Sequence, residues 1–177
     1  MQTFLPDPDF EYSAHILDNK RLAGQRKEGI QLVHANEWHV MAGTPALIAK
    51  KLKKLEDGEP PKRGWGNHPA ARMWAGRTPA LLEYLKAIDR EWIRRGYKST
   101  IVWPDIFETH GPSVMPSWLG DDAFHASHRS NLLRKLPEHY EQFGWQEPPD
   151  LEYIWPGPCT NLVVANAPSP TLSQDHP

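Results

Sequence analysis

The feature that most constrains the fold of this chain is a series of helical patterns separated by proline-rich breaks. Apolar residues recur with a period of about 3.6 residues in several segments, whereas the alternation typical of strands is scarce. Thr44-Pro45 and Thr78-Pro79 each place a capping side chain directly before a proline, a residue favoured at the first helical position. The chain also contains 18 prolines and eight tryptophans. We therefore expect a mainly α protein, a compact single-domain helical bundle with irregular connections rich in proline and tryptophan.

The helical patterns also set the expected organisation of the chain. They predict helices over residues 9–17, 19–36, 44–55, 69–74, 78–95, 121–135 and 137–144. Asp18 and Asp121 are the expected N-caps of two of these helices, and Gly96 is the expected C′ residue of a third. The expected irregular segments are residues 56–66 and 97–120, the latter with a turn near 105–108. We expect a helical domain over residues 1–156 and a flexible carboxy-terminal tail over residues 157–177.

Charge and cysteine content limit the classes of function. The net charge of −2 argues against a general polyanion binder, but the charges are segregated. Basic clusters occur at residues 20–27, 50–54, 90–98 and 129–135, and acidic ones at 56–59 and 138–152. A basic face on a mildly acidic protein is therefore expected. The single Cys159 excludes an intramolecular disulfide and fits a reducing cytoplasm.

The start of the chain and its hydropathy give an expectation for location. No apolar run approaches the ~20 residues that span a bilayer. The first residues lack the cationic start and apolar stretch of a secretion signal. We expect a cytoplasmic protein without a membrane partner.

Residues 20–28, KRLAGQRKE, carry the most informative functional pattern. One carboxylate, Glu28, stands among Lys20, Arg21, Arg26 and Lys27. Nearby positive charge favours the ionised form of a carboxyl group. Such a group suits an enzyme that acts on a polyanion, because cations bind phosphates while a carboxylate moves protons. The alternative is a solvated helix face with ordinary ion pairs.

Further polar residues extend this candidate site. Arg21, Gln25 and Glu28 fall on a stripe beside the apolar face of their helix, so they should not point fully to the core. In the segment 67–74, His68 precedes a helical turn that also carries Arg72, and a histidine there can meet a phosphate. Capping explains this segment equally well.

The helix expected after Asp121 has a second polar face. The residues on or next to this face are His125, His128, Arg129 and Arg134, and they can bind phosphate or stabilise a displaced DNA strand. The alternatives are partly solvated histidines or a metal site formed by Asp122 with the two histidines. No paired Cys or His motif supports a metal, and we expect no cofactor.

The order of these motifs resembles the phage-type pyrimidine-dimer DNA glycosylases, small α-helical enzymes that excise damaged bases and can then cleave the backbone. The resemblance covers residues 1–156, and a bacterial branch of the family shares the TFLP, NHPA-RMW and AFHASHRSNLLRK blocks. The family's basic residue and catalytic glutamate align with Lys27-Glu28. The carboxy-terminal aromatic region is represented by Tyr140, Phe143, Trp145, Tyr153 and Trp155.

The resemblance implies a mechanism and a partner. Family members flip out a nucleotide, attack the deoxyribose C1′ with the amino-terminal amine, and use the glutamate to assist proton abstraction at C2′. It implies a monomer that binds double-stranded DNA with a damaged or modified base. Carried over, Glu28 is the general acid/base, and Lys27 with Arg21 and Arg26 binds the flanking phosphates. The amine would belong to Met1 or Gln2.

The chain departs from the family pattern at two positions. The family nucleophile is a small residue exposed after methionine removal, but here Gln2 follows Met1 and its bulk should block that removal. Gln31 replaces an arginine expected one turn beyond the glutamate. AP lyase activity through Met1, or a glycosylase in which Glu28 activates water, both stay open. A non-catalytic nucleic-acid-binding protein and a metal-dependent nuclease are the alternatives from other classes.

Overall fold

The computed structural model describes residues 2–59, 64–106 and 110–158, and its regular structure is helical. The elements are α1 (Phe10–Ile16), α2 (Asn19–Asn36), α3 (Pro45–Glu56), α4 (Pro69–Met73), α5 (Thr78–Arg94), α7 (Asp122–Lys135), α8 (Pro137–Tyr140) and the 3₁₀ turn η1 (Glu141–Phe143). The described ranges contain no strand beyond an isolated antiparallel bridge between Gly43 and Val102. The expectation of a mainly α single-domain fold is confirmed.

Side-chain capping explains where most of these helices begin. Asp18 accepts hydrogen bonds from the first backbone amides of α2, and Asp121 does the same for α7. Thr44 caps α3 as predicted. The helix predicted over residues 78–95 is present as α5, but its predicted N-cap was wrong, because the N-cap is Arg77 and Thr78 is the first helical residue, with a fully buried side chain.

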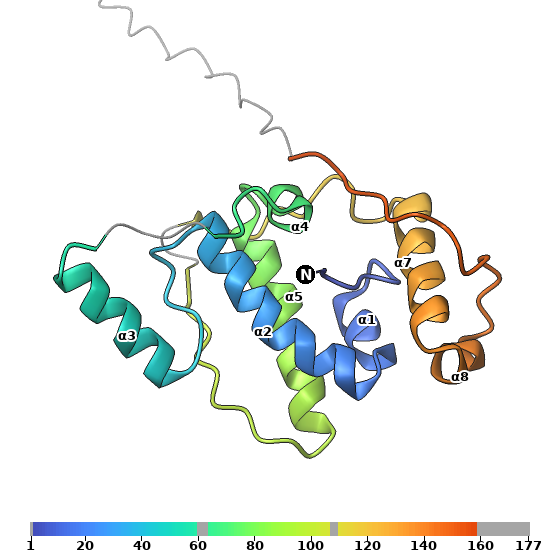
Figure 1. The fold of residues 1–177 in the computed structure, drawn as a ribbon, viewed down its shortest axis with the longest axis horizontal. Helices are drawn as coiled ribbons and strands as arrows, with labels where there is room; N and C mark the ends of the chain where they lie inside the picture. The colour runs from blue at the N-terminus through green and yellow to red at the C-terminus, as the bar shows by residue number, and fades with distance from the viewer. Residues whose placement is uncertain (1, 60–63, 107–109, 159–177) are drawn as a thin grey trace, which may run out of the picture.

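The centre of the molecule is the pair α2 and α5, which pack along each other (Figure 1). Gly29 permits their close approach, since a Cβ at this position would lie 2.0 Å from Leu85 Cδ2. Both residues are buried. The contact therefore fixes the rotation of α2, and with it the direction in which the neighbouring Glu28 points.

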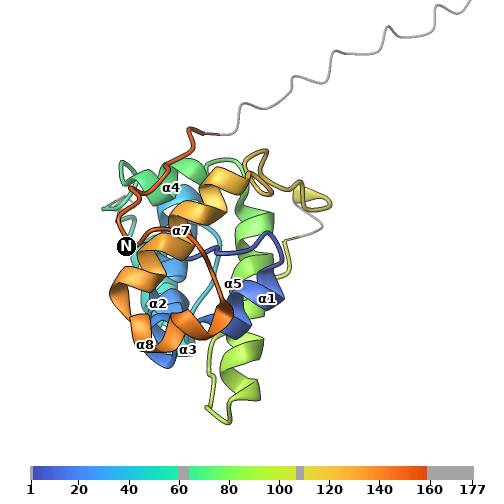
Figure 2. The same ribbon diagram turned by 90° about the vertical axis from the view of Figure 1, so that its right-hand side faces the viewer.

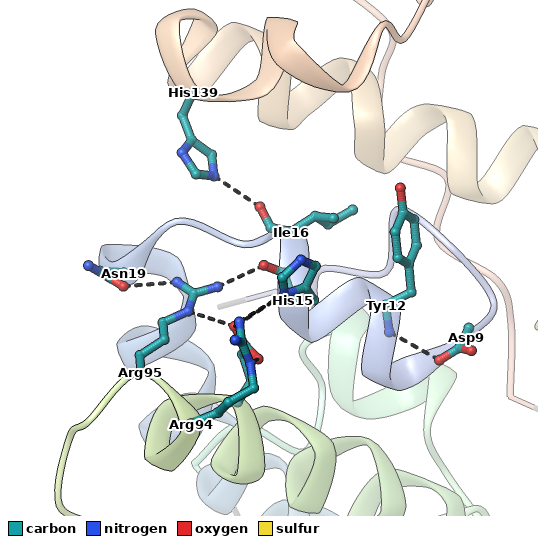
Figure 3. Close-up of polar contacts among 9 residues, drawn as sticks. Asp9, Tyr12, His15, Ile16, Asn19, Arg94, Arg95 and His139 are labelled. Atoms are coloured by element: carbon teal, nitrogen blue, oxygen red, sulfur yellow. Dashed lines mark hydrogen bonds and ion pairs between the residues drawn. The ribbon is translucent and has the colours of Figure 1, made fainter.

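Helix α1 also packs on α5, and the buried carboxylate of Glu91 lies at the junction; Figure 3 labels its partners Arg94 and Arg95. Arg94 and Arg95 both bind Glu91, and Arg95 also donates to the side chain of Asn19 and the carbonyl oxygen of His15. Burial alone would raise the pKa of Glu91, but the hydrogen bonds from the two arginines lower it to about 2. The basic pair at the end of α5 thus joins three helices.

An extended amino-terminal segment, residues 2–6, runs between the α2–α5 pair and α7 (Figure 1). Figure 2 shows α7 crossing in front of this segment, with α2 and α5 behind it. Thr3 and Leu5 are almost completely buried. An extended backbone inside a helical protein must find hydrogen-bond partners outside itself, and side chains of the surrounding helices supply them.

Some expectations concern residues that the structure does not describe. Residues 159–177 hold Cys159 and most of the expected tail, and they lie outside the described ranges, as does part of the turn expected near 105–108. The boundary between domain and tail stays a prediction. None of the described helices has the length and apolar character needed to cross a membrane.

Candidate active site

The amino-terminal segment meets Glu28 at its first described residue. The backbone nitrogen of Gln2 donates a hydrogen bond of 3.0 Å to Glu28 Oε2. Gln2 is buried, and Glu28 is half-buried on α2. The structure therefore brings the carboxylate selected from the sequence to the start of the polypeptide. Met1, the other residue predicted to carry the amine, lies outside the described residues.

Gln25, one turn before Glu28, holds the segment in place. Its Oε1 accepts hydrogen bonds from Phe4 N at 3.1 Å and from the Tyr84 hydroxyl at 2.9 Å, and its Nε2 donates to Gln2 O at 2.7 Å. Gln25 is only 2% exposed. This burial corrects the expectation that it lies at the helix margin and contacts DNA; its amide instead pairs with buried backbone groups.

The histidines of α7 fix the other side of the segment. Leu5 N donates to His128 Nδ1 at 3.2 Å, and His125 Nδ1 bonds to Leu5 O at 2.8 Å. Because Gly120 N donates to His125 Nε2, His125 carries its proton on Nδ1 and is neutral. Burial, with smaller effects from His125 and Arg129, lowers the pKa of His128 to about 3.

This arrangement also answers two predictions for α7. His125 and His128 are buried, so the expected contact with DNA phosphates does not fit their placement. Three of their four ring nitrogens already bond to the backbone, while Asp122 is exposed. The same bonds leave no metal site at Asp122, His125 and His128.

The predicted arginines differ in how firmly the protein holds them. Arg21 pairs with Asp18 at 2.8 Å. Arg26 pairs with Asp89 at 2.7 Å and lies 4.7 Å from the centre of the Trp92 ring. Both guanidinium groups are largely covered, with side-chain exposures of 14% and 13%. Because each guanidinium group is held by its acidic partner, its reach toward a phosphate is limited.

Other predicted cations are more accessible. Lys27 is exposed, and within the described ranges no side chain pairs with it. Arg72 is exposed on α4, and Arg134 is exposed on α7 and bonds to Asn131. Arg129 instead donates to the Pro6 carbonyl oxygen and pairs with Glu147, so it acts on the amino-terminal segment.

His68 is the predicted residue that joins the site from α4. Its Nδ1 accepts a hydrogen bond of 3.1 Å from Ala70 N, which makes it the N-cap of α4. Burial lowers the pKa of His68, and the charge of Glu28 acts in the opposite direction. The imidazole therefore lies within electrostatic range of the candidate catalytic carboxylate.

Sequence reasoning missed several residues that build the site. Trp74 Nε1 donates to the Thr3 hydroxyl at 3.0 Å, and the Tyr84 hydroxyl shares its one proton between Gln25 Oε1 and Phe4 O, the latter 3.0 Å away. Both aromatic residues are fully buried. The sequence contained no signal for the polar tips that reach a segment some 70 to 80 residues away.

A different set of residues could hold a metal ion. Within the described part of the chain, Glu37, His39 and His110 place three ligand atoms within 4.8 Å of one another. Glu37 and His110 already share a hydrogen bond of 2.5 Å. Glu37 caps the far end of α2, nine residues or about 13 Å from Glu28 along the helix. This set is therefore separate from the amino-terminal segment.

Comparisons with known proteins identify the family of this chain. The sequence profile described as pyrimidine dimer DNA glycosylase matches residues 1–105, a range that contains the amino-terminal segment, Glu28 and His68. The comparisons with curated proteins and with solved structures return no match. Because the profile covers more than half of the 177 residues, the chain belongs to the pyrimidine dimer DNA glycosylase family.

Proposed function

We propose that this protein is a DNA glycosylase that excises damaged bases from duplex DNA, with pyrimidine dimers as the first substrate class to test. Glu28 is its proposed catalytic acid/base. The observation that carries the proposal is the 3.0 Å contact between Gln2 N and Glu28 Oε2. It supports a site in which a carboxylate and the head of the chain act on the same sugar.

The proposed chemistry begins with a free amine at the head of the amino-terminal segment. An α-amine has a reference pKa near ~8, so a fraction is unprotonated at neutral pH. Its lone pair attacks deoxyribose C1′, and the base leaves with the electrons of the glycosidic bond. Loss of the amine protons and opening of the sugar ring, with a proton delivered to O4′, give an imine at C1′.

Glu28 then serves the lyase step. Its carboxylate takes a proton from C2′, the electrons form a C2′–C3′ double bond, and the 3′ phosphate leaves. Water finally hydrolyses the imine. Either Gln2 or Met1 can carry the amine, because one residue adds only about 3.8 Å between Cα atoms. In the variant without lyase chemistry, Glu28 activates a water molecule for attack on C1′.

Exposed cations would hold the DNA around this centre. We assign phosphate contacts to Lys27, Arg72 and Arg134, whose side chains are accessible. Arg21 and Arg26 are assigned a supporting role, because their guanidinium groups already pair with Asp18 and Asp89. The partner that follows is double-stranded DNA carrying a lesion.

An excision assay with a matched pair of variants tests the proposal. Duplexes containing a cyclobutane pyrimidine dimer, another damaged base or an abasic site are incubated with wild type, Glu28→Gln and Glu83→Gln. Glu83 is an exposed carboxylate on α5 that lies near α1. We expect Glu28→Gln to lower the excision rate by at least about 100-fold, and Glu83→Gln to retain it.

Two outcomes would contradict the proposal. Excision by Glu28→Gln at the wild-type rate would remove the assigned role of this carboxylate. Salt-sensitive DNA binding without chemistry on any of the lesions would instead favour the non-catalytic nucleic-acid-binding alternative.

A further inference from the structure

A row of aromatic rings leads from the core to the surface of the protein. We call its five members the aromatic row: His128, Tyr153, Trp155, His68 and Trp65. Neighbouring rings have centroids 5.5 to 5.9 Å apart along the whole row. The row joins α7, the segment after η1 and the loop before α4, so residues nearly 90 positions apart in sequence meet at one place.

The row is buried at one end and exposed at the other. His128 is fully buried, whereas Trp155 is 37% exposed and Trp65 is 45% exposed. His68 is half-buried between the two indoles, and its ring stands at 73° to Trp65 and 87° to Trp155. The outer end of the row, Trp65, His68 and Trp155, therefore presents large aromatic surfaces to solvent.

Backbone contacts hold the outer end in position. His68 N donates to Trp65 O at 2.9 Å, which closes the turn that carries both rings. The hydrogen bond from Ala70 N to His68 Nδ1 fixes the imidazole between the two indole rings. These rings are held before any ligand arrives, so little rotamer freedom of His68 would be lost on binding.

The position of this outer end relative to Glu28 suggests what it binds. The row begins at His128, which accepts a hydrogen bond from Leu5 N, and the helix that His68 caps is followed by Trp74, which donates to the Thr3 hydroxyl. The rings therefore lie beside the amino-terminal segment, and His68 is within electrostatic range of Glu28. A glycosylase must remove a nucleotide from the base stack, at a cost of a few kcal/mol. Stacking of a base on an aromatic side chain recovers about 1–3 kcal/mol and depends little on base identity.

We propose that Trp65, His68 and Trp155 form a stacking surface for a nucleobase that has left the DNA base stack beside Glu28. The inference rests on the proposed glycosylase function and names a base-binding subsite within it. The base is either the excised one or the base opposite the lesion, since both have the same π face. Its occupancy would hold the duplex open while Glu28 acts.

Binding to a duplex without a target base tests the surface separately from catalysis. The probe is a duplex with a tetrahydrofuran abasic analogue opposite 2-aminopurine, whose fluorescence rises when the base leaves the stack. Only the opposite base can stack in this probe. A second probe pairs 2-aminopurine with a mismatched base and contains no abasic analogue, so that either base can flip. The two are called the abasic probe and the mismatched probe.

We expect Trp65→Ala and Trp155→Ala to weaken binding of these probes by about 5- to 150-fold, the range that 1–3 kcal/mol corresponds to. The difference in 2-aminopurine fluorescence between free and bound duplex should shrink in parallel, while affinity for an undamaged duplex changes less than about twofold. Trp65→Phe should retain most of the affinity. Weaker binding of the abasic probe assigns the surface to the opposite base. Weaker binding of the mismatched probe alone assigns it to the target base.

Tyr12→Ala is the matched control, because Tyr12 is 45% exposed like Trp65 but lies on α1 (Figure 3). This substitution should leave the affinity for both probes unchanged. Wild-type affinity of the two tryptophan variants, or an equal loss on undamaged DNA, would overturn the inference. Circular dichroism of each variant checks that it is folded, and Trp65→Ala alone, in an exposed turn, suffices for the decision.

The same variants separate this inference from the proposed function. If wild type excises no lesion but Trp65→Ala weakens binding of the abasic probe, the stacking surface stands and the glycosylase assignment fails. If lesions are excised and Trp65→Ala binds and acts as wild type does, the glycosylase assignment stands and the stacking surface is wrong.

Discussion

Neighbouring side chains in α2 illustrate how the fold divides the basic cluster into structural and binding residues. Arg26 lies over the Trp92 ring and pairs with Asp89, which is 5% exposed and also accepts hydrogen bonds from Ser99 and Trp103. Lys27 points to solvent. The two cations are equivalent in the sequence, but only one of them is available to a phosphate.

Substitution of each cation should separate stability from DNA affinity. Arg26→Ala leaves Asp89 buried without its cation, so we expect a loss of roughly 3 kcal/mol in the free energy of unfolding. Lys27→Ala should change stability by less than about 0.5 kcal/mol. It should weaken DNA binding for every sequence and lower the slope of log affinity against log salt concentration by about 1.

Urea unfolding and fluorescence anisotropy at several sodium chloride concentrations measure these effects. If the free energy of unfolding of Arg26→Ala equals that of wild type, the ion pair with Asp89 contributes little. An unchanged salt slope for Lys27→Ala would remove that residue from the DNA contact.

At this scale the residue pattern selected Glu28, and the family resemblance linked it to the chain start, but Gln25 was misplaced. Helical periodicity located the stripe that both residues share. It could not show that buried amide and carbonyl groups of Gln2 and Phe4 would make a buried glutamine favourable. Those partners come from an extended segment more than 20 residues away, and local pattern carries no information about them.

Helix α7 has a polar face that is buried, which its sequence pattern did not predict. His125 and His128 serve the amino-terminal segment, while Ser130 donates to Pro148 O and accepts from Leu151 N. The helix thus lies between two extended segments whose backbone groups need partners. Its limits, Asp122–Lys135, were nevertheless predicted well, because the cap at Asp121 is local.

The buried histidines make α7 sensitive to acid. The folded-state pKa of His128, about 3, lies below the ordinary 6.5, and burial lowers that of His125 as well. The unfolded chain therefore binds protons below pH 6.5 that the folded chain does not. The stability that depends on these neutral histidines should be fully present above pH 6.5 and fall as the pH decreases. For His128 the fall continues toward pH 3, at up to about 1.4 kcal/mol per pH unit.

His128→Gln tests this linkage, because glutamine can accept the bond from Leu5 N but does not titrate. We expect this variant to lose about one proton from the pH dependence of unfolding between pH 6.5 and 4. Phe124→Leu, which alters a ring packed 4.5 Å from His128, should lower stability and keep the wild-type slope. Equal slopes for His128→Gln and wild type would contradict a neutral buried His128.

At the scale of the whole molecule, the fold holds an extended chain start in the middle of a helical bundle. Helices α2 and α5 form one side of it and α7 the other, and side chains from all three bond to residues 2–6 (Figures 1 and 2). The helices follow from local sequence signals. Their assembly around the segment does not, because it depends on hydrogen bonds between residues up to 123 positions apart.

The central claim is that Glu28 and the head of the chain form one catalytic centre, and covalent trapping tests it most directly. Wild type is incubated with abasic duplex and borohydride, the adduct is digested, and mass spectrometry identifies the residue that carries the DNA. Intact mass spectrometry of the same sample establishes which residue begins the chain. We predict an adduct on the amino-terminal α-amine in wild type. DNA attached to an internal lysine such as Lys27, or excision without any adduct, would contradict the shared centre.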